Sequence, residues 1–251
     1  MIPGATALLL LIAFVAFAVE VVAGFGGTVI TVTLASFVLP VADILAAVVP
    51  VNIAMSTFIV GRNIRRVDSA LLIRRVLPLM GVGVLAGMLL FRSSQDAVLK
   101  AVFGAFVVVV SAIELRRGAG PGQPLATVPR AVALVVAGIL HGLLACGGPM
   151  LVYVLGREVT DKGVFRATLS AVWLVFNTTL LVGYAHGGTL TRESLTVSAM
   201  LLVPLVGGIV VGEWVHGKLD AVRFRTGVFT ILAGAGGALV LQALVRLSWT
   251  R

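Results

Sequence analysis

The chain has 251 residues, of which 59% are hydrophobic and only 12% are charged, and its mean hydropathy is +1.13. A soluble globular domain carries roughly 25% charged residues, so this composition excludes a soluble protein and indicates burial in lipid. The net charge of +9 does not point to nucleic acid, because the basic residues lie in loops between apolar blocks, where they record membrane orientation. We therefore expect the lipid bilayer, and no nucleic acid, as a partner.

The apolar residues fall in consecutive blocks, which we expect to be helices because an open sheet cannot satisfy its backbone in lipid. Two of the blocks are too short to cross a hydrocarbon core, which needs ~20 residues. Each short block follows a glycine-rich break, at 24–27 and at 146–149, where an interrupted backbone is tolerated only inside protein or beside a cavity. In chain order the blocks are 2–23, 28–39, 41–61, 76–91, 98–115, 131–145, 150–155, 164–184, 195–214 and 228–247.

The two halves of the chain resemble each other. Glu20 stands seven positions before Gly27 as His141 stands before Gly148, and further landmarks recur at an offset of about 120 residues. The further landmarks are Asp43 with Asp161, Pro78 with Pro204, and Asp96 with Asp220. We interpret residues 1–117 as a first repeat, 118–130 as a cytoplasmic linker and 131–251 as a second repeat.

Positive charge predicts how the repeats are oriented. If each break turns a re-entrant hairpin, three full spans remain in each half, and the 19 Lys and Arg residues divide 14 to 5 between the two sides. A through-going span at the second break gives a less uneven division, so the hairpins are favoured. The predicted fold is an all-α polytopic membrane protein of two inverted repeats, each a broken re-entrant helical hairpin plus three transmembrane helices. Such an architecture is typical of secondary transporters.

The two breaks are the candidate binding site. We expect their tips to meet near the membrane midplane, each starting a helix whose N-terminus carries partial positive charge and unpaired N–H donors. Glycines let a ligand approach that backbone closely, so two such ends can bind a small anion without a buried cation. The candidate substrate-binding residues are Gly26, Gly27, Thr28, Asn52, Gly147, Gly148, Pro149, Arg166 and Asn177.

Glu20 and His141 lie two turns before the breaks in otherwise apolar helices. An ionisable side chain within a span is a functional candidate, and both can change charge near neutral pH, so the pair are proton-coupling candidates. The alternative is that both are neutral and hydrogen-bonded inside the bundle.

Other residues have structural interpretations. We expect Asp43 and Asp161 to be helix N-caps, since aspartate is a preferred capping residue. Isolated glycines such as Gly81, Gly83 and Gly87 are interpreted as positions of close helix packing. Trp173 is interpreted as a membrane aromatic, at most an interface anchor.

Several segments resemble the paired glycine-rich motifs of the TauE/SafE sulfite exporter family, also called the 4-toluene sulfonate uptake permease family. They are Gly24-Phe25-Gly26-Gly27-Thr28, the segment from His141 to Gly147-Gly148-Pro149, and Phe165-Arg166-Ala167-Thr168. The resemblance covers nearly the whole chain. It implies a bacterial inner-membrane carrier for sulfite or small organosulfonate anions, often an exporter, coupled to a gradient of protons or another ion. Both termini would then be periplasmic.

The sequence therefore favours a secondary transporter of small sulfur-containing anions that works by alternating access, with no cofactor, no bound metal and no enzymatic activity. One alternative is a carrier or channel for another small anion. A second is a membrane-embedded enzyme resembling lipid phosphatases, which is disfavoured because no nucleophile motif or paired carboxylates are present. The exact anion, the direction of transport, the coupling ion and a homodimeric state stay open.

Overall fold

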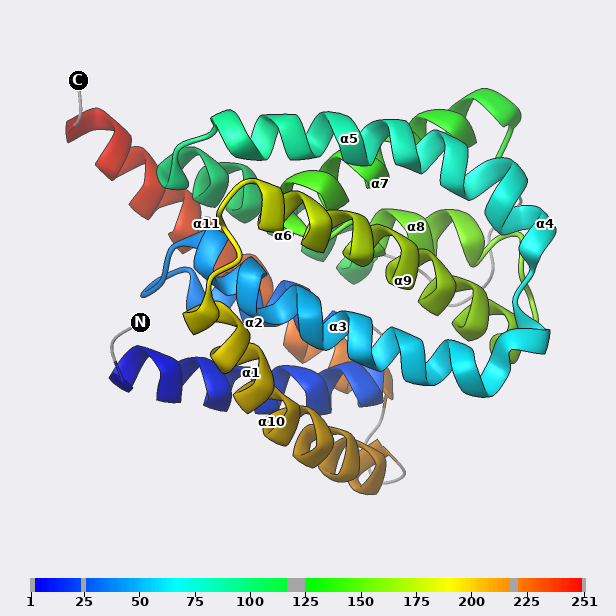
Figure 1. Ribbon diagram of the computed structural model, residues 1–251, viewed down its shortest axis with the longest axis horizontal. Helices are drawn as coiled ribbons and strands as arrows, with labels where there is room; N and C mark the ends of the chain where they lie inside the picture. Colours follow the sequence, from blue (N-terminus) through cyan, green and yellow to red (C-terminus); the bar gives the residue numbers. More distant parts are fainter. Residues whose placement is uncertain (1–2, 24–25, 117–124, 217–220, 250–251) are drawn as a thin grey trace. The chain divides into compact units, whose positions relative to one another are not determined.

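A computed structural model describes residues 3–23, 26–116, 125–216 and 221–249 (Figure 1). Over these residues the chain forms helices and no strand, which confirms the all-α prediction. The elements are α1 (Pro3–Ala23), α2 (Gly27–Ala35), α3 (Val41–Asn63), η1 (Ile64–Arg66), α4 (Ser69–Leu71), η2 (Leu72–Val76), α5 (Leu77–Ser93), α6 (Asp96–Arg116), α7 (Thr127–Leu144), α8 (Gly148–Leu155), α9 (Lys162–His186), α10 (Arg192–His216) and α11 (Ala221–Trp249).

Within the described ranges, eight helical stretches are long and apolar enough to cross a membrane. They include α1 and α7, which the sequence analysis assigned to the arms of re-entrant hairpins. The short helices α2 and α8, with 9 and 8 residues, follow the two glycine breaks as predicted. The chain thus has the helices of a polytopic membrane protein together with two pieces too short to span.

The helices form two compact units. Unit 1 comprises residues 1–47, 94–118 and 192–251, and unit 2 comprises residues 48–93 and 119–191. Each unit draws helices from both predicted repeats. Unit 1 contains α1, α2 and α6 with α10 and α11, whereas unit 2 contains α5 with α7, α8 and α9. Helix α3 continues from unit 1 into unit 2 after Ala47.

In unit 2, α5 and α7 pack closely through two pairs of glycines (Figure 1). A Cβ added at Gly83 would meet the Gly138 Cα at 2.9 Å, and one added at Gly87 would meet the Gly142 Cα at 2.9 Å. Both pairs have the same spacing along the chain, so the two helices run parallel. The interpretation of Gly83 and Gly87 as packing positions is confirmed, whereas a Cβ on Gly81 would make only an ordinary contact of 3.8 Å with Phe176.

In unit 1, α10 packs on α1 with the same parallel sense. A Cβ at Gly208 would meet Phe14, Phe17 and Ala18, and a Cβ at Gly212, one turn later, would meet Ala18 and Val21. Contacts on α1 therefore advance along the chain as those on α10 advance. Small residues again allow the two backbones to approach.

The third close pair, α6 with α11, runs antiparallel. A Cβ at Gly104 would meet Val240, and a Cβ at Gly236 would meet Val107, so the contact moves backward along α11 as it moves forward along α6. These two helices occupy equivalent positions in the two predicted repeats. Equivalent helices that pack antiparallel are what an inverted pair of repeats requires.

Asp43 and Asp161 were both predicted to be helix N-caps, and only one of the two predictions is confirmed. Asp161 is confirmed as the N-cap of α9, because its Oδ1 accepts the N–H three residues later at 2.8 Å. The prediction for Asp43 is wrong, since α3 already begins at Val41. The Val41 N–H donates instead to Asp96 Oδ1 at 2.8 Å, and Asp96 pairs with the buried Lys100 at 3.0 Å. A carboxylate distant in sequence thus satisfies the end of α3.

The glycine packing in unit 2 predicts opposite effects for one substitution at two helical sites. Gly138→Ala puts a methyl group against the Met80 carbonyl and should lower the free energy of unfolding by about 1–3 kcal/mol. Gly61→Ala, on α3, meets nothing within 4 Å and should raise it by roughly 0.5–1 kcal/mol through helix propensity. Thermal unfolding in detergent measures both, and equal effects at the two sites would contradict the close packing.

Candidate functional site

The break between α7 and α8 is a tight, buried turn. Helix α7 ends at Leu144, and Ala145 takes a left-handed backbone with φ of 52° while its N–H donates to the His141 carbonyl at 2.7 Å. A non-glycine residue in this region costs roughly 1–2 kcal/mol, so surrounding structure holds the turn in place. Helix α8 then starts at Gly148, with Pro149 in its first turn. Both residues suit a helix start, since proline needs no N–H acceptor there.

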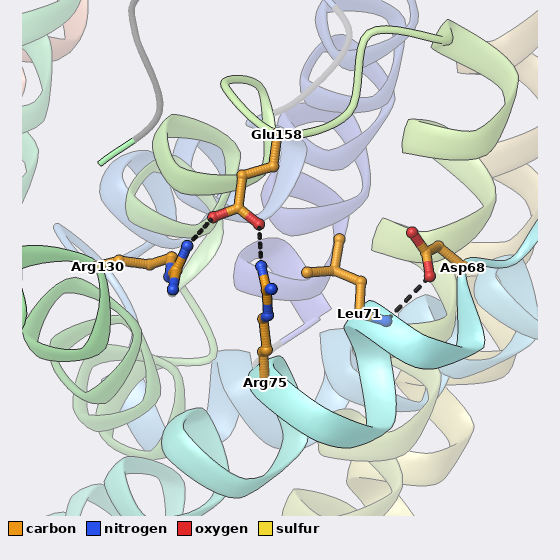
Figure 2. A network of polar contacts seen from close by, with 5 residues as sticks. All are labelled: Asp68, Leu71, Arg75, Arg130 and Glu158. Atoms are coloured by element: carbon orange, nitrogen blue, oxygen red, sulfur yellow. Dashed lines mark hydrogen bonds and ion pairs between the residues drawn. The ribbon is translucent and has the colours of Figure 1, made fainter. Parts of the chain in front are cut away.

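Three charged side chains fasten the two ends of the α7–α8 segment together (Figure 2). The Glu158 carboxylate, just beyond α8, accepts from Arg130 at 3.0 Å and from Arg75 at 3.3 Å. Arg130 lies in the first turn of α7 and Arg75 in η2, the π-helical turn that leads into α5. The chain therefore returns after α8 to the end at which α7 began. Glu158 is only 12% exposed, so both pairs are partly shielded from water.

His141 lies at the centre of unit 2 with no partner for either ring nitrogen. Its side chain is 2% exposed, and neither Nδ1 nor Nε2 makes a hydrogen bond within the described residues. The imidazole stacks on the Trp173 ring, with centroids 5.1 Å apart and planes inclined by 18°. Trp173 also lies 3.7 Å from the position of a Cβ on Gly148. Stacking on Trp173 thus holds the imidazole near the start of α8.

Two further buried polar groups of α9 lie beside the same break. Asn177 is 3% exposed, it is a close neighbour of the imidazole, and its Oδ1 has no hydrogen-bond partner within the described residues. The Tyr184 hydroxyl is buried near Cys146 and is also unpartnered there. A buried polar group without a partner costs about 1–3 kcal/mol. His141 and Asn177 near one helix start, with the Tyr184 hydroxyl near the break that precedes it, indicate a place for a polar ligand.

Four residues, among them Trp173 and Asn177, lie on one face of α9. Arg166, Ser170, Trp173 and Asn177 are spaced by four, three and four positions, which is the spacing of one helical face. Arg166 is exposed, Ser170 and Asn177 are buried, and Trp173 is half-buried between them. Arg166 lies roughly 16 Å along the helix from Asn177, so it does not touch the His141 cluster. The interpretation of Trp173 as an interface anchor missed this stripe, although its spacing was readable from the sequence.

At the corresponding break in unit 1, a side chain of the protein lies against the start of the short helix. Gly26 is the N-cap of α2 with φ of 106°, a left-handed conformation that favours glycine. The Glu20 carboxylate lies against Gly27, whose backbone N–H donates to it, and a Cβ on Gly27 would clash with Glu20 Oε2. A side chain of the protein itself therefore supplies the negative charge at this helix start.

The remaining predicted site residues divide between the two units. Gly26, Gly27 and Thr28 lie in unit 1, whereas all other substrate-binding candidates lie in unit 2. Asn52 and Thr28 both make a polar interaction, and Gly147 packs so closely on α7 that a Cβ would meet the Ala137 carbonyl. Gly24 and Phe25, quoted for the first motif, lie outside the described residues. That the two tips meet stays a prediction.

Comparison with known proteins assigns the chain to a family. The model of the sulfite exporter family TauE/SafE matches residues 9–239. The chain belongs to this family. It is 26% identical over 225 residues to a protein of Cupriavidus necator named probable sulfite/organosulfonate exporter TauE, and the match covers 88% of this chain and 87% of the relative. No solved structure matches the chain. The family confirms the resemblance and, with the eight apolar helices, an integral membrane transporter.

The unpartnered hydroxyl at the site predicts a stability gain when it is removed. Tyr184→Phe should raise the free energy of unfolding by about 1 kcal/mol, because a buried unsatisfied group is lost and the ring contact with Phe91 is kept. The control is Ser198→Ala, since the buried Ser198 hydroxyl lies 2.8 Å from the Ala47 carbonyl and its removal should cost about 1 kcal/mol. Thermal unfolding in detergent distinguishes the two signs, and a destabilised Tyr184→Phe variant would argue against an unfilled site.

Proposed function

We propose that the protein exports sulfite or small organosulfonate anions across the bacterial inner membrane. The family and the name of the Cupriavidus necator relative support this class of substrate. The observation that carries the proposal is the pair of buried side chains His141 and Asn177 near the start of α8, each with an unpartnered polar atom within the described residues, together with the unpartnered Tyr184 hydroxyl near the preceding break. In this proposal a sulfur oxyanion binds there and accepts hydrogen bonds from an imidazole N–H and from the Asn177 Nδ2–H groups, which the amide presents once it is rotated.

The start of α8 has the chemistry that such an anion needs. The N–H groups of Gly148 and Met150 have no acceptor within the helix, and the helix dipole adds partial positive charge. The Nδ2–H groups of the Asn177 amide and an imidazole N–H add donors, so a sulfite or sulfonate group can accept from side chains as well as from the helix start. No arginine or lysine is needed at this depth, and the anion is held weakly enough to leave.

The close helix pairs support the inverted topology on which transport by alternating access would rest. The topology predicted from the division of positive charge makes α1 parallel to α10 and α5 parallel to α7, and it makes α6 antiparallel to α11. The glycine contacts have the same three directions. The Arg130–Glu158 pair in turn supports a re-entrant α7–α8 hairpin, since both of its ends lie together. On this topology both termini are periplasmic and the alternating motion involves the two repeats.

The position of His141 supports a site deep in the membrane. Along α7 it lies roughly 16 Å from Arg130, and Asn177 lies roughly 16 Å from Arg166 along α9. Both cationic residues belong to the side rich in positive charge, which is cytoplasmic by the positive-inside rule. Half the thickness of a ~30 Å hydrocarbon core is a similar distance, so both polar side chains would lie near the midplane.

Two alternatives are less well supported. A carrier for another small anion would use the same donors, and only binding measurements separate it from a sulfite carrier. A lipid phosphatase-like enzyme would need a nucleophile beside an acid or base. The buried hydroxyl and imidazole of Tyr184 and His141 share no hydrogen bond within the described residues, and the family is one of exporters.

The proposal predicts that the Asn177 amide contributes to anion binding. Asn177→Leu should weaken the apparent affinity for sulfite about 10- to 100-fold, the effect of losing one hydrogen bond to a charged group. Asn177 is a close neighbour of His141, so the stability of the variant is measured separately from its affinity. Counterflow of radiolabelled sulfite in proteoliposomes gives the apparent affinity, and thermal unfolding of the same preparation gives the stability.

The matched control is Asn63→Leu in the same unit. The Asn63 amide donates to the Ile59 carbonyl at 3.0 Å and lies at the far end of α3, so sulfite affinity should be unchanged. Gly148→Ala tests the helix start directly, since its Cβ would make only an ordinary contact of 3.7 Å with Trp173. An unaltered sulfite affinity in both Asn177→Leu and Gly148→Ala would remove the α8 site.

A further inference from the structure

The two broken helices are chemically unequal, although the repeats place them at equivalent positions. Helix α2 begins against the Glu20 carboxylate, whereas helix α8 begins near an imidazole and an amide that lack partners. In the repeat alignment His141 replaces Glu20. One helix start therefore already holds a negative group, and the other is open to one.

From this asymmetry we infer that α8 takes the transported anion while α2 with Glu20 forms a separate proton-binding site. The inference rests on the proposed function and divides its two broken helices between two ligands. A helix N-terminus that holds a carboxylate has no charge left to attract a second anion, and mutual repulsion would oppose one. The carboxylate can instead take up a proton, which removes its charge and so weakens its electrostatic attraction to the positive end of the α2 dipole.

The surroundings of Glu20 favour such a role. It is the sole titratable side chain described on α1, and α2 carries none over residues 27–35. On α10, which packs on α1, Glu213 is exposed and follows Gly212, whose Cβ position would meet Val21. The other charged or titratable residues of α10 and α11 are Arg192 and Glu193 at the start of α10 and Arg246 near the end of α11, together with His216, Arg223 and Arg225, whose side chains lie outside the described part. Helix α6, which packs on α2, carries the ion pair of Asp96 with Lys100, the buried Glu114 and the exposed Arg116. The partner of the Glu20 carboxylate is the Gly27 N–H at the start of α2.

The proposed proton site and the proposed anion site belong to different compact units. Protonation of Glu20 changes the charge at α2 in unit 1, whereas every unpartnered group proposed to hold the anion lies on α7, α8 or α9 in unit 2. His141, the second proton-coupling candidate of the sequence analysis, is assigned here to the anion. Removing the carboxylate should therefore abolish the response to a pH gradient and leave anion exchange intact.

The test compares Glu20→Gln with wild type and with the control Glu213→Gln, all reconstituted in proteoliposomes. Glutamine has the same shape and can still accept from Gly27, so a purely structural cap is retained. We expect Glu20→Gln to keep sulfite counterflow at equal pH within about twofold and to lose sulfite flux driven by a pH gradient at least tenfold. Glu213→Gln should match wild type in both measurements. The protonation of sulfite itself is the same for all three proteins.

Either of two results would overturn the inference. Gradient-driven flux that persists in Glu20→Gln excludes Glu20 as the proton site, and loss of counterflow together with driven flux means that Glu20 acts in anion movement itself. An infrared titration of the three purified proteins, without sulfite, provides a second measurement. A protonated-carboxyl band should be absent from Glu20→Gln and present in Glu213→Gln, and an unchanged band would also refute the assignment. Wild type that moves no sulfite would refute the proposed function, while the infrared result would still decide for Glu20.

Discussion

A helix that is broken inside hydrocarbon leaves backbone N–H groups that water cannot satisfy, and the rest of this structure depends on how each of them is satisfied. At α2 the answer is a carboxylate from the preceding helix, Glu20. At α8 the described residues surround the helix start with polar groups that themselves lack partners. The free N–H groups at the start of α2 are therefore satisfied by a carboxylate of the protein itself. Those at the start of α8, we propose, are satisfied by the transported anion.

Glycine packing determines which way the site residues point. Gly138 and Gly142 of α7 bring its backbone against α5, and His141 lies between them in sequence. With one face of α7 committed to that contact, the rotation of the helix is set, and the imidazole meets Trp173 and Phe176 of α9. Close backbone packing thus positions His141, the side chain most relevant to binding.

Polar contacts at the other end of the α7–α8 hairpin also hold these helices in position. Glu158 joins the start of α7 to the π-helical turn before α5, and the Asp68 backbone N–H donates to the buried Thr168 hydroxyl of α9 at 2.9 Å. These contacts tie α7, α8 and α9, the helices around the polar cluster, to the segment before α5. They do so at the end of the helices distant from the cluster. Partly buried pairs of this kind hold geometry more than they add stability, which suits a site whose own polar groups are left open.

The sequence by itself determined the helical class, the two breaks, the short helices after them and the family, because each depends on local composition and spacing. It also indicated Glu20, His141 and Asn177 as unusual, since polar groups are costly in apolar helices. Only the tertiary structure decided that Asp96 rather than Asp43 serves the start of α3, that Trp173 stacks on His141, and that Glu20 lies against Gly27. The physical reason is that a capping acceptor or a stacking partner is chosen by proximity in space, and residues distant in sequence become neighbours only when the helices pack.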